Sequence, residues 1–147
     1  NINMNAGSTI HLKGGIYNVN SLNTNGNAQI IIENGPVFMN VAGANTNQPL
    51  NLSGNAISNL SYDPTWFHII YGGTSDITIS GGTASSAMVY APNSDVTLAG
   101  GSDFYGSVVG PAIIDTGGTH YHYDRRLQND FMVAGNFMMS AFTWRKY

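Results

Sequence analysis

The sequence contains no cysteine and few charged residues. Without Cys the chain can form neither a disulfide nor a cysteine-type zinc site, and it can carry no thiol nucleophile. Charged residues make up 9% of the 147 residues, whereas about 25% is usual for a globular domain. The surface must therefore be polar and largely neutral.

Basic side chains are missing from most of the chain, because no Lys or Arg occurs between Lys13 and Arg125. Nucleic acid is therefore a poor partner, since phosphate binding needs clustered Lys and Arg. A polysaccharide lyase needs a basic proton acceptor and a glycoside hydrolase needs paired acids, whereas the acidic residues here are scattered. Gly-x-Ser-x-Gly, phosphate-loop and His-Glu-x-x-His motifs are also missing, so we expect no enzyme.

Long apolar runs are missing as well. No stretch of about 18 apolar residues occurs, and residues 1–5 have neither the basic head nor the apolar core of a signal peptide. We therefore expect no membrane segment in this chain and place any anchor or export signal upstream of Asn1. What the chain has instead is 18 Gly residues and as many Asn, and both types tolerate the left-handed backbone of sharp turns.

A repeat is present in the second half of the chain. Residues 69–82 and 88–101 align at an offset of 19, with shared Tyr, Ser-Asp, Thr and Gly-Gly positions and exchanged aliphatic residues between them. This alignment places Tyr71 level with Tyr90. A third, shorter copy follows, and its later register is ambiguous.

The first half of the chain shows a fainter period of 20 residues. Apolar residues two apart, bounded by Gly and Asn, are typical of short half-buried strands. Stretches near residues 42–48 and 55–65 break the period and are interpreted as loops. The expected columns are Ile10, Ile30 and Leu50; Leu12, Ile32 and Leu52; and Tyr17, Val37 and Ile57.

A strand that recurs in this way cannot bury its apolar side alone, but coils stacked about 4.8 Å apart form a continuous inner wall. The sequence therefore predicts an all-β fold: a single-stranded, right-handed parallel β-helix (β-solenoid) with rungs of 19–20 residues and about seven coils. We expect the solenoid over residues 1–123. Residues 124–147 are expected to cap its end as part of the same domain, with a short helix, or alternatively to form a last strand and a frayed tail.

Two sets of residues are candidate metal ligands. In an extended strand His120, His122 and Asp124 project to one side, an arrangement that suits a metal ion. The alternative is a structural strand in which these side chains fix the final coil by hydrogen bonds. Asp76 and Asp95 stack one coil apart in the repeat, where calcium could relieve their repulsion. The alternative is a turn in which each carboxylate accepts backbone N–H groups. No cofactor is expected.

Exposed aromatic side chains are candidates for contact with a ligand. Tyr62, Trp66, Phe67 and Tyr71 could stack on sugar rings, although core packing explains some of them equally well. Stacked coils also make long flat faces with regularly spaced amides and hydroxyls. Such faces suit a glycan, a solid surface or a neighbouring subunit.

Two short segments are distinctive: Tyr-Ala-Pro-Asn at residues 90–93 and His-Tyr-Asp at residues 122–124. These and several other segments resemble an uncharacterised bacterial domain found at the carboxyl end of PilX-like type IV pilus assembly proteins and in other exported surface proteins. The resemblance extends to about Leu127 and implies a β-solenoid displayed outside the cell by a minor-pilin-like parent. It carries over no catalytic residue. Further matching segments are residues 14–17, 21–23, 35–37, 50–56, 89–98 and 104–110.

Together these patterns predict a non-enzymatic extracellular structural or adhesive module, the exposed part of a pilus-associated or cell-surface bacterial protein. Its expected partners are other pilus or surface subunits and glycans or solid surfaces. Two alternatives stay open. One is a carbohydrate-binding or polysaccharide-acting β-helix protein, and the other is a self-assembling filament subunit whose solenoid ends stack.

Overall fold

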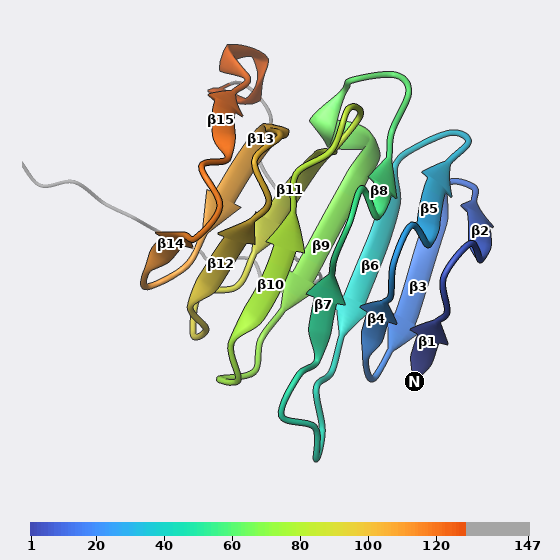
Figure 1. Ribbon diagram of the computed structural model, residues 1–147, viewed down its shortest axis with the longest axis vertical. Helices are drawn as coiled ribbons and strands as arrows, with labels where there is room; N and C mark the ends of the chain where they lie inside the picture. Colours follow the sequence, from blue (N-terminus) through green and yellow to red (C-terminus); the bar gives the residue numbers. More distant parts are fainter. Residues whose placement is uncertain (129–147) are drawn as a thin grey trace, which may run out of the picture.

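The computed structural model describes residues 1–128 as an all-β structure of short parallel strands (Figure 1). Sheet A contains β1 (Ile2–Met4), β4 (Leu22–Thr24), β7 (Leu50–Leu52), β10 (Ile77–Ser80), β12 (Val96–Ala99) and β14 (Ile113–Asp115). Sheet C contains β3 (Gly15–Val19), β6 (Val37–Val41), β9 (Phe67–Tyr71), β11 (Ser86–Tyr90), β13 (Asp103–Val109) and β15 (His120–Tyr123). Sheet B contains β2 (Thr9–Leu12), β5 (Gln29–Ile32) and β8 (Ile57–Ser58). Two 3-10 helices are η1 (Pro64–Trp66) and η2 (Arg125–Gln128).

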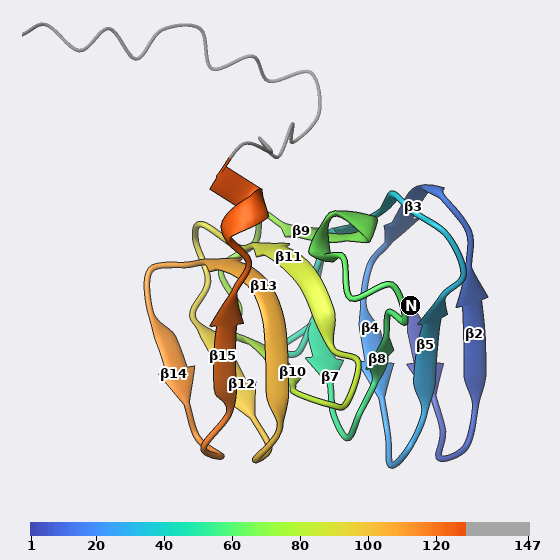
Figure 2. The same cartoon turned by 90° about the horizontal axis from the view of Figure 1, so that it is seen from above.

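Each turn of the chain adds one strand to sheet A and one to sheet C, so the strands stack into six coils of a β-solenoid. The first three coils also contribute β2, β5 and β8 to sheet B and have three sides, whereas the later coils have two sheets (Figure 2). The predicted all-β solenoid is thus confirmed. The expected number of coils is too high, because one coil runs from Leu22 to its partner Leu50, well beyond a 20-residue rung.

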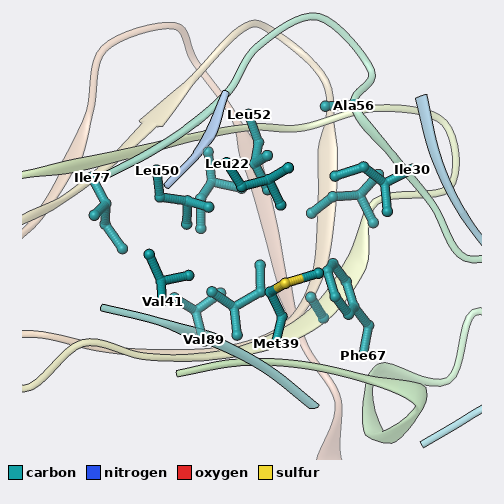
Figure 3. Close-up of a cluster of buried hydrophobic side chains, with 14 of the residues drawn as sticks. Leu22, Ile30, Met39, Val41, Leu50, Leu52, Ala56, Phe67, Ile77 and Val89 are labelled. Atoms are coloured by element: carbon teal, nitrogen blue, oxygen red, sulfur yellow. The ribbon is translucent and has the colours of Figure 1, made fainter. Parts of the chain in front are cut away.

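Inward side chains of the facing sheets A and C form one apolar core (Figure 3). In sheet A the register stacks Leu50 on Leu22. In sheet C it stacks Ile69 on Met39 and Val89 on Ile69. Burial of apolar surface contributes about 25 cal/mol per Å². Since each strand is short, these columns across coils supply most of that burial.

The corners that lead into sheet B use residues with a left-handed backbone. Gly7, Asn27 and Asn55 each come shortly before a strand of this sheet, with φ of 77°, 53° and 57°. Gly has no Cβ to clash in this conformation, and Asn adopts it more readily than other side chains do. Gly and Asn therefore supply the sharp turn that leads into sheet B in each of the first three coils.

The 19-residue repeat is confirmed in sheet A and is wrong by one residue in sheet C. Ile77 pairs with Val96 as expected, but Tyr90 pairs with Ile70 and not with Tyr71. Counted from the paired residues, the path from Ile70 to Ile77 is one residue longer than the path from Tyr90 to Val96. A shift of one position turns a side chain to the other face. Tyr71 is therefore a core residue, only 1% exposed, whereas Tyr90 is half-buried on the outer face.

The 20-residue period of the first half is confirmed over β2 and β5, where the first two columns begin as expected. The prediction is wrong for Leu50 and Leu52, the third members of these two columns, and for the whole third column. The loop expected near residues 42–48 is confirmed, and its length shifts the register of the following strands away from the 20-residue period. The loop expected near 55–65 contains β8 and most of η1. The observed partners are Ile57 for Ile30, Leu22 for Leu50, Thr24 for Leu52, Met39 for Tyr17 and Phe67 for Val37.

After β15 the described chain ends in η2. Leu127 is 7% exposed, and its N–H donates to the carbonyl of Asp124 at 3.0 Å. A short helix at the start of the expected cap is therefore present. The rest of that cap, residues 129–147, lies outside the described residues. Within residues 1–128 no helix is long and apolar enough to cross a membrane.

Replacing a core residue of one column tests this packing. Ile79 is fully buried in sheet A on top of Leu52, so Ile79→Ala should lower the free energy of unfolding by about 2–5 kcal/mol because it leaves a cavity. Thr78→Ala, at the neighbouring outward position, is the control and should change it by about 0.5 kcal/mol or less. Urea unfolding curves measure both, and similar losses for the two variants would contradict the assigned register.

Candidate functional site

The outer face of sheet A is a flat, uncharged surface. The register places Asn3, Asn23 and Asn51 in one outward column, which Thr78 and Thr97 continue. These residues alternate with core residues along their strands, so their side chains point to solvent. The face thus presents amides and hydroxyls at the spacing of the coils, about 4.8 Å.

Three rings gather on the outer face of sheet C toward the carboxyl-terminal coils, and we call Tyr62, Tyr105 and His122 the ring cluster. Tyr105 and His122 are paired across β13 and β15, and their rings stack with centroids 4.6 Å apart and planes inclined by 14°. Tyr62 meets Tyr105 edge to face, with centroids 6.0 Å apart and planes at 89°. Tyr62 is 47% exposed, and Tyr105 is half-buried.

Tyr62 comes from the loop before η1, far from β13 in the sequence. The loop is fixed by the amide of Asn59, which donates to the carbonyl of Asp63 at 2.8 Å and to a carbonyl of β11 at 3.2 Å. The carboxylate of Asp63 accepts the N–H of Thr65 at 3.0 Å and so caps η1. Tyr62 itself has φ of 52°, a conformation that a bulky residue adopts only where its surroundings hold it. Its hydroxyl donates to the carbonyl of Thr83 at 3.1 Å.

Asp103 joins the ring cluster to a second histidine. His122 Nε2 lies 2.8 Å from Asp103 Oδ1, and His120 Nδ1 lies 3.6 Å from the same oxygen. His120 and His122 therefore do face one side of a strand, but the carboxylate between them is Asp103 of the preceding coil, and Asp124 follows the end of β15. Across residues 1–128 no three His, Asp or Glu side chains are arranged to hold a metal ion. The contacts that are present tie β15 to β13.

Asp115 fixes the turn that leads into β15. Its Oδ1 accepts the backbone N–H groups of Thr119 and Gly117, both at 3.1 Å. These hydrogen bonds favour the ionised carboxylate and lower the pKa of Asp115 below its ordinary value, with the bond from Thr119 as the larger cause. Because His120 and His122 follow directly after this turn, Asp115 helps to position both imidazoles.

Asp76 and Asp95 lie at equivalent corners one coil apart, as predicted, because the residues that follow them are paired. Serine side chains fasten these corners. Ser94 Oγ donates to the carbonyl of Ser75 at 2.9 Å, and the N–H of Ser75 donates to the hydroxyl of Tyr71 at 3.2 Å. Calcium binding at the two carboxylates stays a prediction.

Of the four aromatic residues predicted for ligand contact, Tyr62 lies at the surface. The prediction is wrong for Phe67 and Tyr71, which are 0% and 1% exposed. The register of β9 places both side chains in the core, beside Val37 and Val41 of β6. Trp66 is half-buried against Gly35, where a Cβ would lie 2.6 Å from its atoms. Sequence reasoning missed Tyr105 and Asp103, since the final coil is shorter than the 19-residue repeat and only the observed register brings them to β15.

Comparison with known protein families identifies a match over most of the chain. A family model described as "Domain of unknown function (DUF7305)" matches residues 3–130, which span the solenoid from β1 to η2. No curated protein and no solved structure matches the chain. The surfaces of the molecule are therefore the basis for assigning a function.

The hydrogen bonds of Asp115 predict how stability depends on pH. A carboxylate whose pKa is lowered by folding stabilises the fold above its unfolded pKa, and this contribution is lost as the pH falls through the lowered folded pKa. The wild-type chain should therefore lose more stability below about pH 4 than Asp115→Asn does.

Urea midpoints at about pH 7 and about pH 3 measure this difference. Asp76→Asn, the same exchange at an exposed corner, is the control and should retain the acid dependence of the wild type. An equal loss in the wild type and in Asp115→Asn would show that the turn hydrogen bonds do not favour the charged carboxylate.

Proposed function

This chain belongs to the family described as Domain of unknown function (DUF7305), and for it we propose a non-enzymatic structural and adhesive role on the outside of a bacterial cell. Its parent is a pilus-associated, minor-pilin-like protein or another cell-surface protein, as the resemblance at residues 90–93 and 122–124 implies. The solenoid is the exposed part of that parent and contacts neutral glycans. The ring cluster is the observation that carries this proposal.

The architecture of the solenoid supports a role in presenting a regular polar surface to a partner. A continuous core holds the outward side chains of sheet A in register from Asn3 to Thr97, so the face is rigid and regular. Residues 14–124 contain no Lys or Arg, and a surface of this kind does not attract polyanions. Amides and hydroxyls instead exchange hydrogen bonds with neutral polar partners.

The ring cluster suits the binding of a sugar. A pyranose has an apolar C–H face that packs on an aromatic ring, and hydroxyls around its edge that seek hydrogen bonds. The perpendicular rings of Tyr62 and Tyr105 offer such a face. Beside them the carboxylate of Asp103 is 43% exposed and can accept from hydroxyl groups. A carbohydrate-binding role, the second candidate function, is therefore part of the same proposal.

Binding without bond cleavage fits the chemistry of this cluster. Glycoside hydrolysis uses two carboxyl groups about 5–9.5 Å apart, one of them kept protonated as an acid. The carboxylate in direct contact with the cluster, Asp103, is instead hydrogen-bonded by His122 at 2.8 Å. We therefore assign the cluster a binding role and no catalytic one.

Removing the central ring tests the proposal. Tyr105→Ala should weaken retention on immobilised neutral polysaccharides about tenfold, because the lost ring surface corresponds to about 1–2 kcal/mol. Tyr90→Ala, a half-buried tyrosine on the outer face of the same sheet, is the matched control and should bind as the wild type does. Affinity electrophoresis through cellulose, xylan or chitin derivatives measures retention, and a reducing-end assay should detect no cleavage. Equal retention of all three proteins, or measurable cleavage, would contradict the proposal.

The location of the domain is tested separately. Antibodies against residues 1–128 should label intact bacteria that express the parent protein, since the proposal places the solenoid outside the envelope. An antibody against a cytoplasmic protein, which labels only permeabilised cells, is the control. Labelling of the solenoid only after permeabilisation would show that the domain is not displayed.

A further inference from the structure

A second polar site lies on sheet A, away from the ring cluster. A groove of about 330 Å³ follows the outward column of β1, β4 and β7, and Gln48, from the loop after β6, is one of the residues that line it. Figure 1 shows these three strands in sequence, with the loop projecting beyond β7. We call this hollow the amide groove, because six carboxamide side chains line it. They belong to Asn3, Asn5, Asn23, Asn25, Gln48 and Asn51.

One acceptor in the amide groove has no partner. Asn23 Oδ1 is buried and accepts no hydrogen bond within the described residues, and the amide of Asn23 reaches Asn3 Oδ1 only at 3.4 Å. A comparable pair on sheet C is well paired, with Asn40 Nδ2 donating to Asn18 Oδ1 at 2.9 Å. Leaving a buried acceptor unpaired costs about 1–3 kcal/mol, so a ligand hydroxyl that displaces the flanking carboxamides slightly and donates to Asn23 Oδ1 recovers that free energy.

The lining determines the chemical class of the ligand. No side chain that lines the amide groove is charged, whereas calcium sites rely on carboxylates and phosphate sites on Arg, Lys or helix ends. Each carboxamide offers two N–H donors and one acceptor. A ligand with many adjacent hydroxyls, each both donor and acceptor, complements such a lining.

We propose that the amide groove binds a neutral saccharide, with a sugar hydroxyl donating to Asn23 Oδ1 and others bonded to Asn51 and Gln48. This inference rests on the proposed function of glycan contact and adds a second subsite to it. Sheets A and C lie on opposite sides of the core (Figure 3). The amide groove occupies the first three coils and the ring cluster the later ones, so one domain can hold two glycan chains, and weak contacts then add through avidity.

Side-chain amide signals of the ¹⁵N-labelled chain test this inference. Titration with methyl glycosides of glucose, galactose and mannose, and with N-acetylglucosamine, should shift the NH₂ signals of Asn23, Asn51 and Gln48. Asn51→Ala and Gln48→Ala should each weaken binding at these signals about tenfold, because each removes hydrogen bonds to the sugar. Gln48 lies in an exposed loop, so its variant tests the site without risk to the core. Asn40→Ala, which removes an amide from the opposite face, should leave the affinity unchanged.

The outcomes separate this inference from the proposed function. Shifts confined to Tyr105 and His122 would overturn the amide groove and leave the ring cluster in place. Shifts confined to the amide groove would support the inference and count against the ring cluster. No shift at either site with any of the four sugars would overturn both. If Asn51→Ala lowers the urea midpoint but changes no sugar-induced shift, the column is only a structural ladder and the inference is wrong.

Discussion

The stability of each coil depends on the packing of its inward side chains against those of the neighbouring coil. Strands as short as Ile57–Ser58 bury little surface by themselves, and isolated short strands are unstable in water. Stacking in register turns them into columns, such as Leu22 beneath Leu50, that run through the solenoid. Because the columns supply most of the stability, the outer positions carry fewer structural demands than the core. A chain with only 9% charged residues can therefore fold without surface ion pairs in every coil.

The same dependence makes the length of each corner decisive. One extra residue on the path from Ile70 to Ile77 leaves sheet A in register and shifts sheet C by one position. That shift buries Tyr71 and turns Tyr90 outward, although the two occupy equal places in the sequence repeat. The hydroxyl of the buried Tyr71 accepts the N–H of Ser75. This hydrogen bond holds the corner between β9 and β10.

The period of the apolar residues was enough to predict the fold, because the apolar columns are repeated in the sequence itself. Ile77 with Val96 and Ile10 with Ile30 pair as the repeats require. Pairings across unequal coils could not be predicted, since loop lengths shift the register without leaving a pattern of their own. Asp103 meets His120 because the final coil is short, and Tyr62 meets Tyr105 because of the path of one loop. The sequence therefore predicted more of the core pairings than of the contacts in the candidate site.

Both candidate sites lie where the chain departs from its own repeat. Regular coils place like side chains above one another, and such a face offers every partner the same amides and hydroxyls. The loop after β6 adds Gln48 to the lining of the groove beside the column of sheet A. The loop before η1 sets Tyr62 at right angles to Tyr105. Long surface loops cost a fold little entropy and commonly carry function. Both proposed recognition sites thus include residues from irregular loops, and the regular coils between them supply a rigid spacing.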